Sequence, residues 1–240
     1  MNIKTRKTSK LFVIASVAVS ILSFTAGCKK DNDDTPEPPA VESGRVALLN
    51  AAFGADSVNL FVDAKKVNSK LLGYGDSLKY FDVTAGERSF ELKGKDDKSI
   101  VKKSFKTDKD KNYSIVATNS KDGETFELVQ ITDDLAAPKA DMAKIRLVNL
   151  SPDAGKLNLV SGETDLAENI DYKSASAYKE VDAETTSFDI VDPEAEKTLL
   201  TITDLELAEG KIYTIWVSGL QETEEEKEEL KAHIFINERK

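Results

Sequence analysis

An internal repeat is the feature of this 240-residue sequence that most restricts its fold. The segment VALLN (residues 46–50), followed by VNL (58–60), returns as IRLVN (145–149) and LNL (157–159). The offset stays at about 99 residues through this block, as it does between Asn50 and Asn149. Aromatic and aliphatic positions continue the correspondence further along the chain. A repeat of this length predicts two copies of one folded unit.

Apolar residues recur at every second position within each copy, as in residues 58–62, 90–92 and 113–117. This alternation predicts β-strands with one face in a core and the other face in solvent. Turn-forming residues separate the strands, for example at 73–76 and 151–155. About seven short strands per copy and no long helical pattern predict an all-β chain of antiparallel sandwiches. In the one helix-like stretch, residues 222–230, the crowded acids favour a solvated loop or a single helical turn.

Three runs in the first copy resemble the DUF4397 domain: RVALLNAAFGADSVNLFVD (45–63), LLGYGDSLKYFDVTAGERSFEL (71–92) and KNYSIVATN (111–119). The second copy keeps the Asn-x-Ser-Pro-Asp-Ala core of that family at residues 149–154. The first copy departs from this core at Phe53 and Gly54, where Pro-Asp is expected. The resemblance implies an immunoglobulin-like or transthyretin-like topology and assigns no reaction.

The amino terminus has the pattern of an export signal. Four basic residues before position 11 precede an uncharged apolar run, 11–24, which is shorter than the roughly 20 residues of a membrane-spanning helix. Thr25, Ala26, Gly27 and Cys28 then resemble the lipobox of bacterial lipoproteins, with Thr25 in place of the usual leucine. The resemblance implies cleavage before Cys28 and attachment of diacylglycerol and an N-acyl chain to it, so that the membrane is a partner. The alternative is a secretory signal with an incidental cysteine.

The residues after Cys28 resemble the surface-export signal of Bacteroidetes lipoproteins. This signal would consist of Lys29, Lys30, Asp31, Asp33 and Asp34. It implies an outer-membrane lipoprotein on the extracellular face; the alternatives are a periplasm-facing lipoprotein and a merely solvated tether. Prolines and acids between 31 and 43 predict a flexible stalk.

These observations together define an expected organisation. We expect a signal peptide at 1–27, a tether at 28–44, a first DUF4397-like β-sandwich at 45–137 and a second at 143–240. The fold class is all-β, with two tandem antiparallel sandwiches after a cleaved signal and a disordered stalk.

Charge and residue usage exclude several classes of protein. The chain has 33 basic and 43 acidic residues; four basic residues precede Cys28, so the mature part has 29 against 43 and a formal charge of −14. Such a surface disfavours nucleic acid, whose binding depends on lysine and arginine. One cysteine and one histidine, His233, cannot form the usual zinc site, and we expect His233 to be a surface or satisfied strand residue.

Three residues are candidates for ligand binding. Tyr74 and Tyr172 follow loops and could stack against sugars or peptides, but their recurrence in both copies favours packing within each domain. Asp153 could bind calcium together with loop carbonyls, as could the acids at 31–34, although turn formation and solvation explain them better. No other cofactor is expected.

The function expected from the sequence is that of a non-catalytic envelope protein. Adhesion, capture of a glycan or protein ligand, and a role as an envelope-complex subunit all fit it. The alternative is a hydrolytic or carbohydrate-active enzyme that uses a carboxylate pair, which would need a cleft and one raised pKa.

Overall fold

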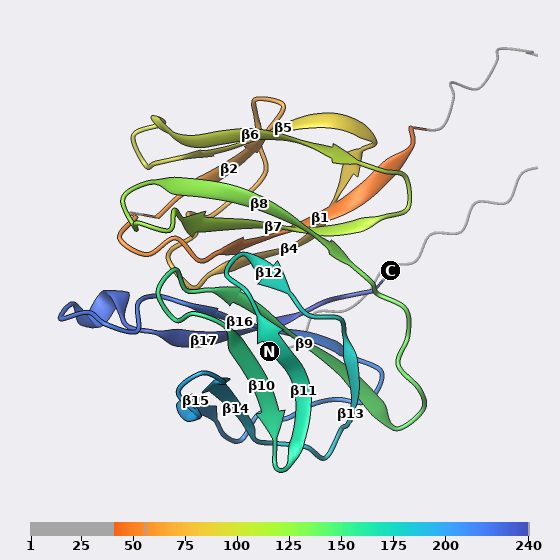
Figure 1. Cartoon of the computed structure of the whole chain (residues 1–240). Coiled ribbons are helices and arrows are strands. Elements are labelled where there is room, and N and C mark those ends of the chain that lie inside the picture. The colour runs from red at the N-terminus through yellow and green to blue at the C-terminus, as the bar shows by residue number, and fades with distance from the viewer. Residues whose placement is uncertain (1–40, 56, 240) are drawn as a thin grey trace, which may run out of the picture. The chain divides into compact units, whose positions relative to one another are not determined.

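The computed structural model describes residues 41–55 and 57–239, and these residues form an all-β structure (Figure 1). The first half of the described chain contains eight strands. They are β1 (Ser43–Asn50), β2 (Asn59–Val62), β3 (Lys65–Lys66), β4 (Ser77–Thr84), β5 (Gly86–Lys93), β6 (Ser99–Thr107), β7 (Asn112–Asn119) and β8 (Phe126–Asp133).

These strands make two four-stranded sheets, in the orders β4-β1-β7-β8 and β3-β2-β5-β6. A buried apolar core lies between them, with Leu48 and Ile115 from the first sheet and Leu60 and Phe90 from the second. The expected β-sandwich is therefore confirmed. β1 pairs with β7 in parallel, from Arg45 opposite Asn112 to Asn50 opposite Ala117. The first strand thus lies between the fourth and the seventh, unlike the ABED and CFG orders of constant-type immunoglobulin domains.

The second half has the same strand order. Its elements are β9 (Met142–Leu150), β10 (Leu157–Ser161), β11 (Thr164–Ile170), β12 (Ser174–Ala175), β13 (Lys179–Asp182), β14 (Phe188–Asp192), β15 (Lys197–Ile202), β16 (Ile212–Ser218), the 3-10 turn η1 (Glu226–Glu228) and β17 (Lys231–Ile236). One sheet has the order β12-β9-β16-β17, with β13 also paired to β9, and the other has the order β11-β10-β14-β15. β9 and β16 are parallel, as β1 and β7 are.

Strands β1, β7, β9 and β16 are buried on both faces, and this corrects the expectation of one solvent-exposed face. Every residue of β16 is buried, and every residue of β7 except the first. A third apolar cluster explains the burial, because it joins Leu49 and Val116 of the first half to Val148 and Trp216 of the second. The sheets β4-β1-β7-β8 and β12-β9-β16-β17 are therefore the inner sheets of a four-layer stack (Figure 1).

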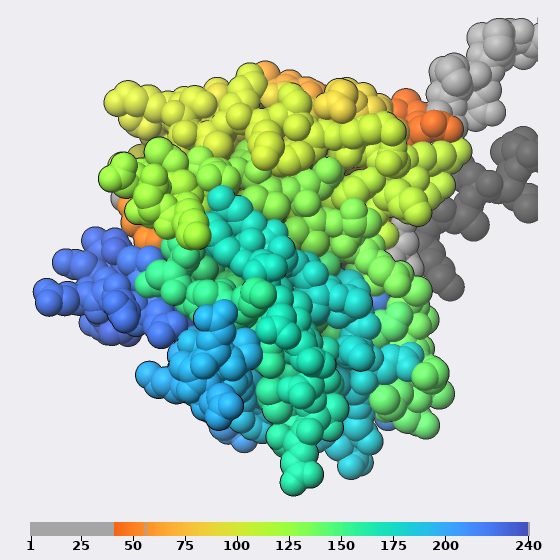
Figure 2. Space-filling view, viewed as in Figure 1, coloured from red at the N-terminus to blue at the C-terminus, as the bar shows by residue number. Residues whose placement is uncertain are grey.

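The acidic stretch 222–230 forms an exposed segment with the single turn η1, as the sequence predicts. Figure 2 shows this segment (blue, left) standing out from the surface. Gly219, three residues before this segment, has φ +90, and a Cβ there would lie 2.2 Å from the carbonyl oxygen of Glu229, so only glycine fits. No helix in the described residues has the length and apolar character needed to cross a membrane.

Candidate functional site at the junction of the sandwiches

A buried ion pair joins the two halves of the described chain. Nη2 of Arg146 on β9 lies 2.5 Å from Oδ1 of Asp133, the last residue of β8. Arg146 is 2% exposed and Asp133 4% exposed. Burial of two charges is costly unless their remaining donors and acceptors are also satisfied. The other hydrogen-bond partners of Arg146 and Asp133 therefore decide what the pair contributes to stability.

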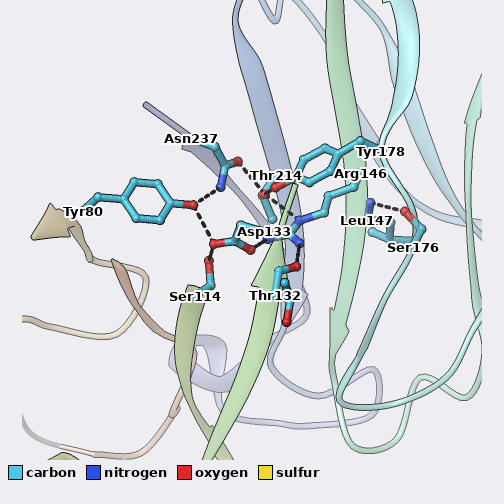
Figure 3. Close-up of polar contacts among 10 residues, drawn as sticks. All are labelled: Tyr80, Ser114, Thr132, Asp133, Arg146, Leu147, Ser176, Tyr178, Thr214 and Asn237. Carbon is cyan, nitrogen blue, oxygen red and sulfur yellow. Dashed lines mark hydrogen bonds and ion pairs between the residues drawn. The ribbon is translucent and has the colours of Figure 1, made fainter. Parts of the chain in front are cut away.

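A continuous hydrogen-bond network supplies those partners (Figure 3). The second carboxylate oxygen of Asp133 accepts bonds from the hydroxyl of Tyr80 at 2.6 Å and from that of Ser114 at 2.8 Å. Nε of Arg146 donates to Thr214 Oγ1 at 2.9 Å, and Nη1 donates to the carbonyl oxygen of Thr132 at 3.3 Å.

Asn237 closes the network into a ring. Its amide nitrogen donates to the Tyr80 hydroxyl at 2.8 Å, and its carbonyl oxygen accepts from Thr214 at 2.7 Å. The guanidinium of Arg146 also lies 4.5 Å from the ring centroid of Tyr178. The ring connects β4 and β8 with β9, β16 and the residue after β17, and Ser114 attaches β7 to it, so the network fixes how the two inner sheets meet.

Arg146 stands out in the local sequence as a charged residue within an apolar strand. Arg146 interrupts the apolar strand IRLVNL, and the equivalent residue of the first copy is Ala47. Charged residues are seldom fully buried without a partner. Arg146 in this strand is therefore a sequence signal for a buried partner, although the pattern of alternation singles out neither Arg146 nor Asp133.

The structure brings Tyr74 and Tyr172 to the same junction, one from each half. The hydroxyl of Tyr74 lies 2.9 Å from Ser218 Oγ, and that of Tyr172 lies 3.5 Å from Thr118 Oγ1 and donates to the carbonyl oxygen of Asn119. Each tyrosine thus reaches the opposite sandwich, whereas the sequence favoured packing within its own. Burial raises the pKa of both hydroxyls. Both rings are only partly exposed, so their hydroxyls serve the junction.

His233 also belongs to the junction, which corrects the expectation of a surface or satisfied residue. Its ring stacks on Trp216 at 4.0 Å between centroids and meets Tyr74 edge-on at 5.6 Å. Its Nε2 atom and the indole nitrogen of Trp216 are buried without a hydrogen-bond partner. Burial, assisted by the charge of Lys231, lowers the pKa of His233 to about 4.

Asp153 anchors the start of the acidic stretch 222–230. Its carboxylate accepts bonds from the backbone nitrogens of Gln221 (2.9 Å) and Glu222 (3.2 Å) and from the hydroxyl of Ser151 (3.0 Å). These are structural contacts that the chain makes with itself. The described residues contain no group of three or more His, Cys, Asp or Glu side chains placed to hold a metal ion.

The electrostatics of the described residues bear on acid and base chemistry. The carboxyl groups whose pKa departs from the ordinary range all have it lowered, chiefly by hydrogen bonds: Asp63, Glu91, Asp96, Asp108, Asp122, Glu180 and Glu238. A glycosidase acid needs the opposite shift. Burial, reinforced by Asp133, raises the pKa of Tyr80, and burial raises that of Tyr178, so both hydroxyls stay protonated near neutrality.

The residues predicted to direct export and lipid attachment lie outside the described part of the chain. They are Thr25, Ala26, Gly27, Cys28, Lys29, Lys30, Asp31, Asp33 and Asp34. The anchor and the export signal stay predictions.

The fold and the junction define an all-β protein of stacked sandwiches in which equivalent inner sheets meet face to face. Residues 44–160 match the sequence model of the family described as a domain of unknown function, DUF4397, so the chain is a DUF4397 domain-containing protein. The matched region runs through the first sandwich and on through β9 to Val160 in β10. A search of curated proteins found no match.

Two solved structures are weakly similar to the chain. One comes from work on α-glucan binding by a streptococcal virulence factor; it is 13% identical, covers 79% of this chain and 96% of its own, and has a TM-score of 0.24. The other is a proposed adhesin from Bacteroides ovatus, 9% identical, covering 80% and 92%, with a TM-score of 0.18. Scores this low support no assignment of function.

Proposed function

We propose that the protein is a lipid-anchored, non-catalytic protein of the cell envelope. In this proposal a flexible tether carries the two sandwiches, acting as one binding head, on the extracellular face of the outer membrane. The observation that supports a single binding head is the buried junction, where Arg146, Asp133 and their partners join the two inner sheets. The ligand is a glycan or another envelope protein.

The junction favours a head that moves as a unit on its tether. The apolar cluster that includes Leu49 and Trp216 removes the inner faces of both sandwiches from water, and the polar ring fixes their register. Two sandwiches joined only by the connection near residues 134–141 would instead be free to reorient. A preoriented pair binds with less loss of conformational freedom.

Anchoring rests on the sequence. The lipobox-like residues 25–28 supply an acylation site, the residues 29–34 resemble a surface-export signal, and the segment 31–43 has the composition of a stalk. An acylated amino terminus followed by a stalk suits a protein that meets its ligand away from the membrane.

The absence of catalysis is also part of the proposal. It rests on the lowered pKa values of carboxyl groups such as Asp63 and Glu91 and on the contacts that Asp153, Tyr74 and Tyr172 make with the chain itself. A carboxylate-dependent hydrolase remains the competing hypothesis that the experiments must exclude.

Anchoring and exposure are tested in the native host. Cys28→Ala should move the protein from the membrane fraction to the soluble fraction. Alanine at Lys30, Asp31, Asp33 and Asp34 should keep it in the membrane but protect it from protease added to intact cells. Unchanged protease sensitivity in the second variant would contradict the export signal, and protection of the wild type would favour the periplasm-facing alternative.

Binding and catalysis are tested on the purified Cys28→Ala chain. A glycan array should give saturable binding, while a panel of hydrolase substrates should give no turnover. Turnover abolished by one Asp or Glu substitution would establish the enzyme hypothesis in place of ours.

A further inference from the structure

An open cavity of about 760 Å³ lies beside the buried network. Its walls come from the start of β1, the turn before β7, the end of β8, the connection between the sandwiches and the end of the described chain. The polar lining includes Ser43, Arg45, Lys111, Asn112, Asp134 and Arg239. Its volume falls in the range of pockets for small ligands, about 300–1,000 Å³.

The cavity carries excess positive charge in a chain whose net charge is −10. Three cations line it, namely Arg45, Lys111 and Arg239. Of the three carboxylates in the lining, Asp133 already pairs with Arg146. Asp110 and Asp134 are the other two, so outside the Asp133–Arg146 pair the lining has three cations against two carboxylates, an excess of one positive charge.

The structure holds one of the cations in place. The guanidinium of Arg45 lies 4.8 Å from the ring centroid of Tyr80, whose hydroxyl is fixed by Asp133 and Asn237. The backbone nitrogen of Arg45 on β1 donates to the carbonyl oxygen of Lys111 at 2.8 Å, so Arg45 and Lys111, the residue just before β7, are neighbours. Groups fixed before binding lose less freedom when a ligand arrives.

The lining specifies the chemistry of the ligand. Arginine binds a carboxylate through paired N–H donors, whereas carboxylates such as Asp110 and Asp134 accept hydrogen bonds from hydroxyl groups. The same two carboxylates repel a doubly charged phosphate. A ligand with one carboxylate and several hydroxyls satisfies both halves of the lining.

We propose that this cavity binds an acidic sugar of the uronic acid class. Its carboxylate contacts Arg45, Lys111 and Arg239, and its hydroxyls contact Asp110 and Asp134. The inference rests on the proposed function, since it names the class of glycan that the head captures.

The test measures ligand binding to the purified Cys28→Ala chain by NMR titration and calorimetry. The probes are glucuronate, glucose and inorganic phosphate. Glucuronate should bind saturably and shift the amides of Lys111 and Asn112, and glucose and phosphate should bind more weakly. Lys111→Gln and Arg239→Gln should each lower the affinity for glucuronate by about tenfold, in line with the loss of one charge-assisted hydrogen bond.

Lys102→Gln is the matched control, because it removes the same charge from an exposed residue of β6 outside the cavity. It should leave glucuronate affinity unchanged. Three results would overturn the inference: no saturable glucuronate binding, equal binding of glucose, or equal losses in the cavity variants and the control. These results leave the array and protease assays of the proposed function untouched, so the two failures are distinguishable.

Discussion

The hydroxyl oxygen of Tyr74 lies 2.9 Å from Ser218 Oγ, and the equivalent pair, Tyr172 of the second copy and Thr118 of the first, makes the reverse crossing at 3.5 Å. Each sandwich therefore sends a tyrosine into the inner sheet of its neighbour. The duplicated unit meets its own copy through the equivalent face, although several side chains there differ, as Arg146 and Ala47 do. The junction is a pseudo-symmetric interface within one chain.

A double-mutant cycle tests this crossing. Tyr74→Phe should lower the free energy of unfolding by about 0.5–1.5 kcal/mol, since it removes one hydrogen bond at a buried serine. Tyr74→Phe combined with Ser218→Ala should show coupling in urea unfolding. Tyr74→Phe combined with Thr118→Ala is the control and should be additive, because these residues belong to different crossings. Equal coupling in both cycles would contradict the assignment.

The buried ion pair should dominate the stability of the junction. Asp133→Ala leaves Arg146 buried without its counter-charge, and we expect a loss of about 3–5 kcal/mol in the free energy of unfolding. Chemical denaturation followed by Trp216 fluorescence measures it, because this indole packs in the junction.

A surface pair provides the comparison for that measurement. Lys79 and Glu238 lie 2.6 Å apart, but their side chains are 75% and 44% exposed. Lys79→Ala should cost less than about 1 kcal/mol, because exposed pairs are screened by water and salt. Similar losses for Lys79→Ala and Asp133→Ala would show that burial of the Asp133 pair contributes nothing.

His233 should make stability depend on pH in mildly acidic solution. Its pKa is about 4 in the folded protein, against about 6.5 for an unfolded histidine. Between these values the unfolded chain binds more protons than the folded chain, so the free energy of unfolding should fall as the pH falls from 6.5 to 4. His233→Phe keeps a flat ring against Trp216 and should reduce this slope.

Equilibrium unfolding at several pH values measures the difference between wild type and His233→Phe. Carboxyl groups titrate in both proteins, so the difference between the two curves isolates the histidine. If the free energies of unfolding of wild type and His233→Phe change in parallel between pH 4 and 6.5, His233 is solvated in the folded protein.

Asp153 should stabilise the acidic stretch 222–230 and not the whole fold. Asp153→Ala removes the acceptor of the Gln221 and Glu222 amides, and their hydrogen exchange should accelerate while the melting temperature stays nearly constant. Asp165→Ala, at an exposed residue of β11, is the control and should leave these amides protected. Calcium or EDTA should not change the melting temperature of the wild type; a calcium-dependent rise would revive Asp153 as a metal ligand.

The sandwiches could be predicted because their strands alternate locally. Residues 58–62 place Leu60 in the core of the first sandwich and show the alternation on which the prediction rests. The same rule failed for β7, where Val116 was expected to face solvent and instead packs against the other half. Strands buried on both faces are nearly continuous apolar runs, and IYTIWV in β16 is such a run.

The junction was harder to predict because its partners are set by tertiary contacts. Nothing in the spacing of Tyr74 shows that it reaches Ser218, which is 144 residues away. Arg146 was visible as a charge in an apolar strand, but its partner Asp133 ends another strand among many exposed acids. Sequence reasoning can recognise such a charge as buried and cannot select its counter-ion.

The position of β1 has a mechanical consequence. The chain that precedes Ser43 continues directly into β1, which lies between β4 and β7 in the middle of a sheet. A pull on that end along the strand loads two rows of backbone hydrogen bonds in shear, those to β4 and those to β7, and cannot peel an edge strand away one bond at a time. A head held in flowing liquid by its amino terminus should therefore resist unfolding at the point where the force enters.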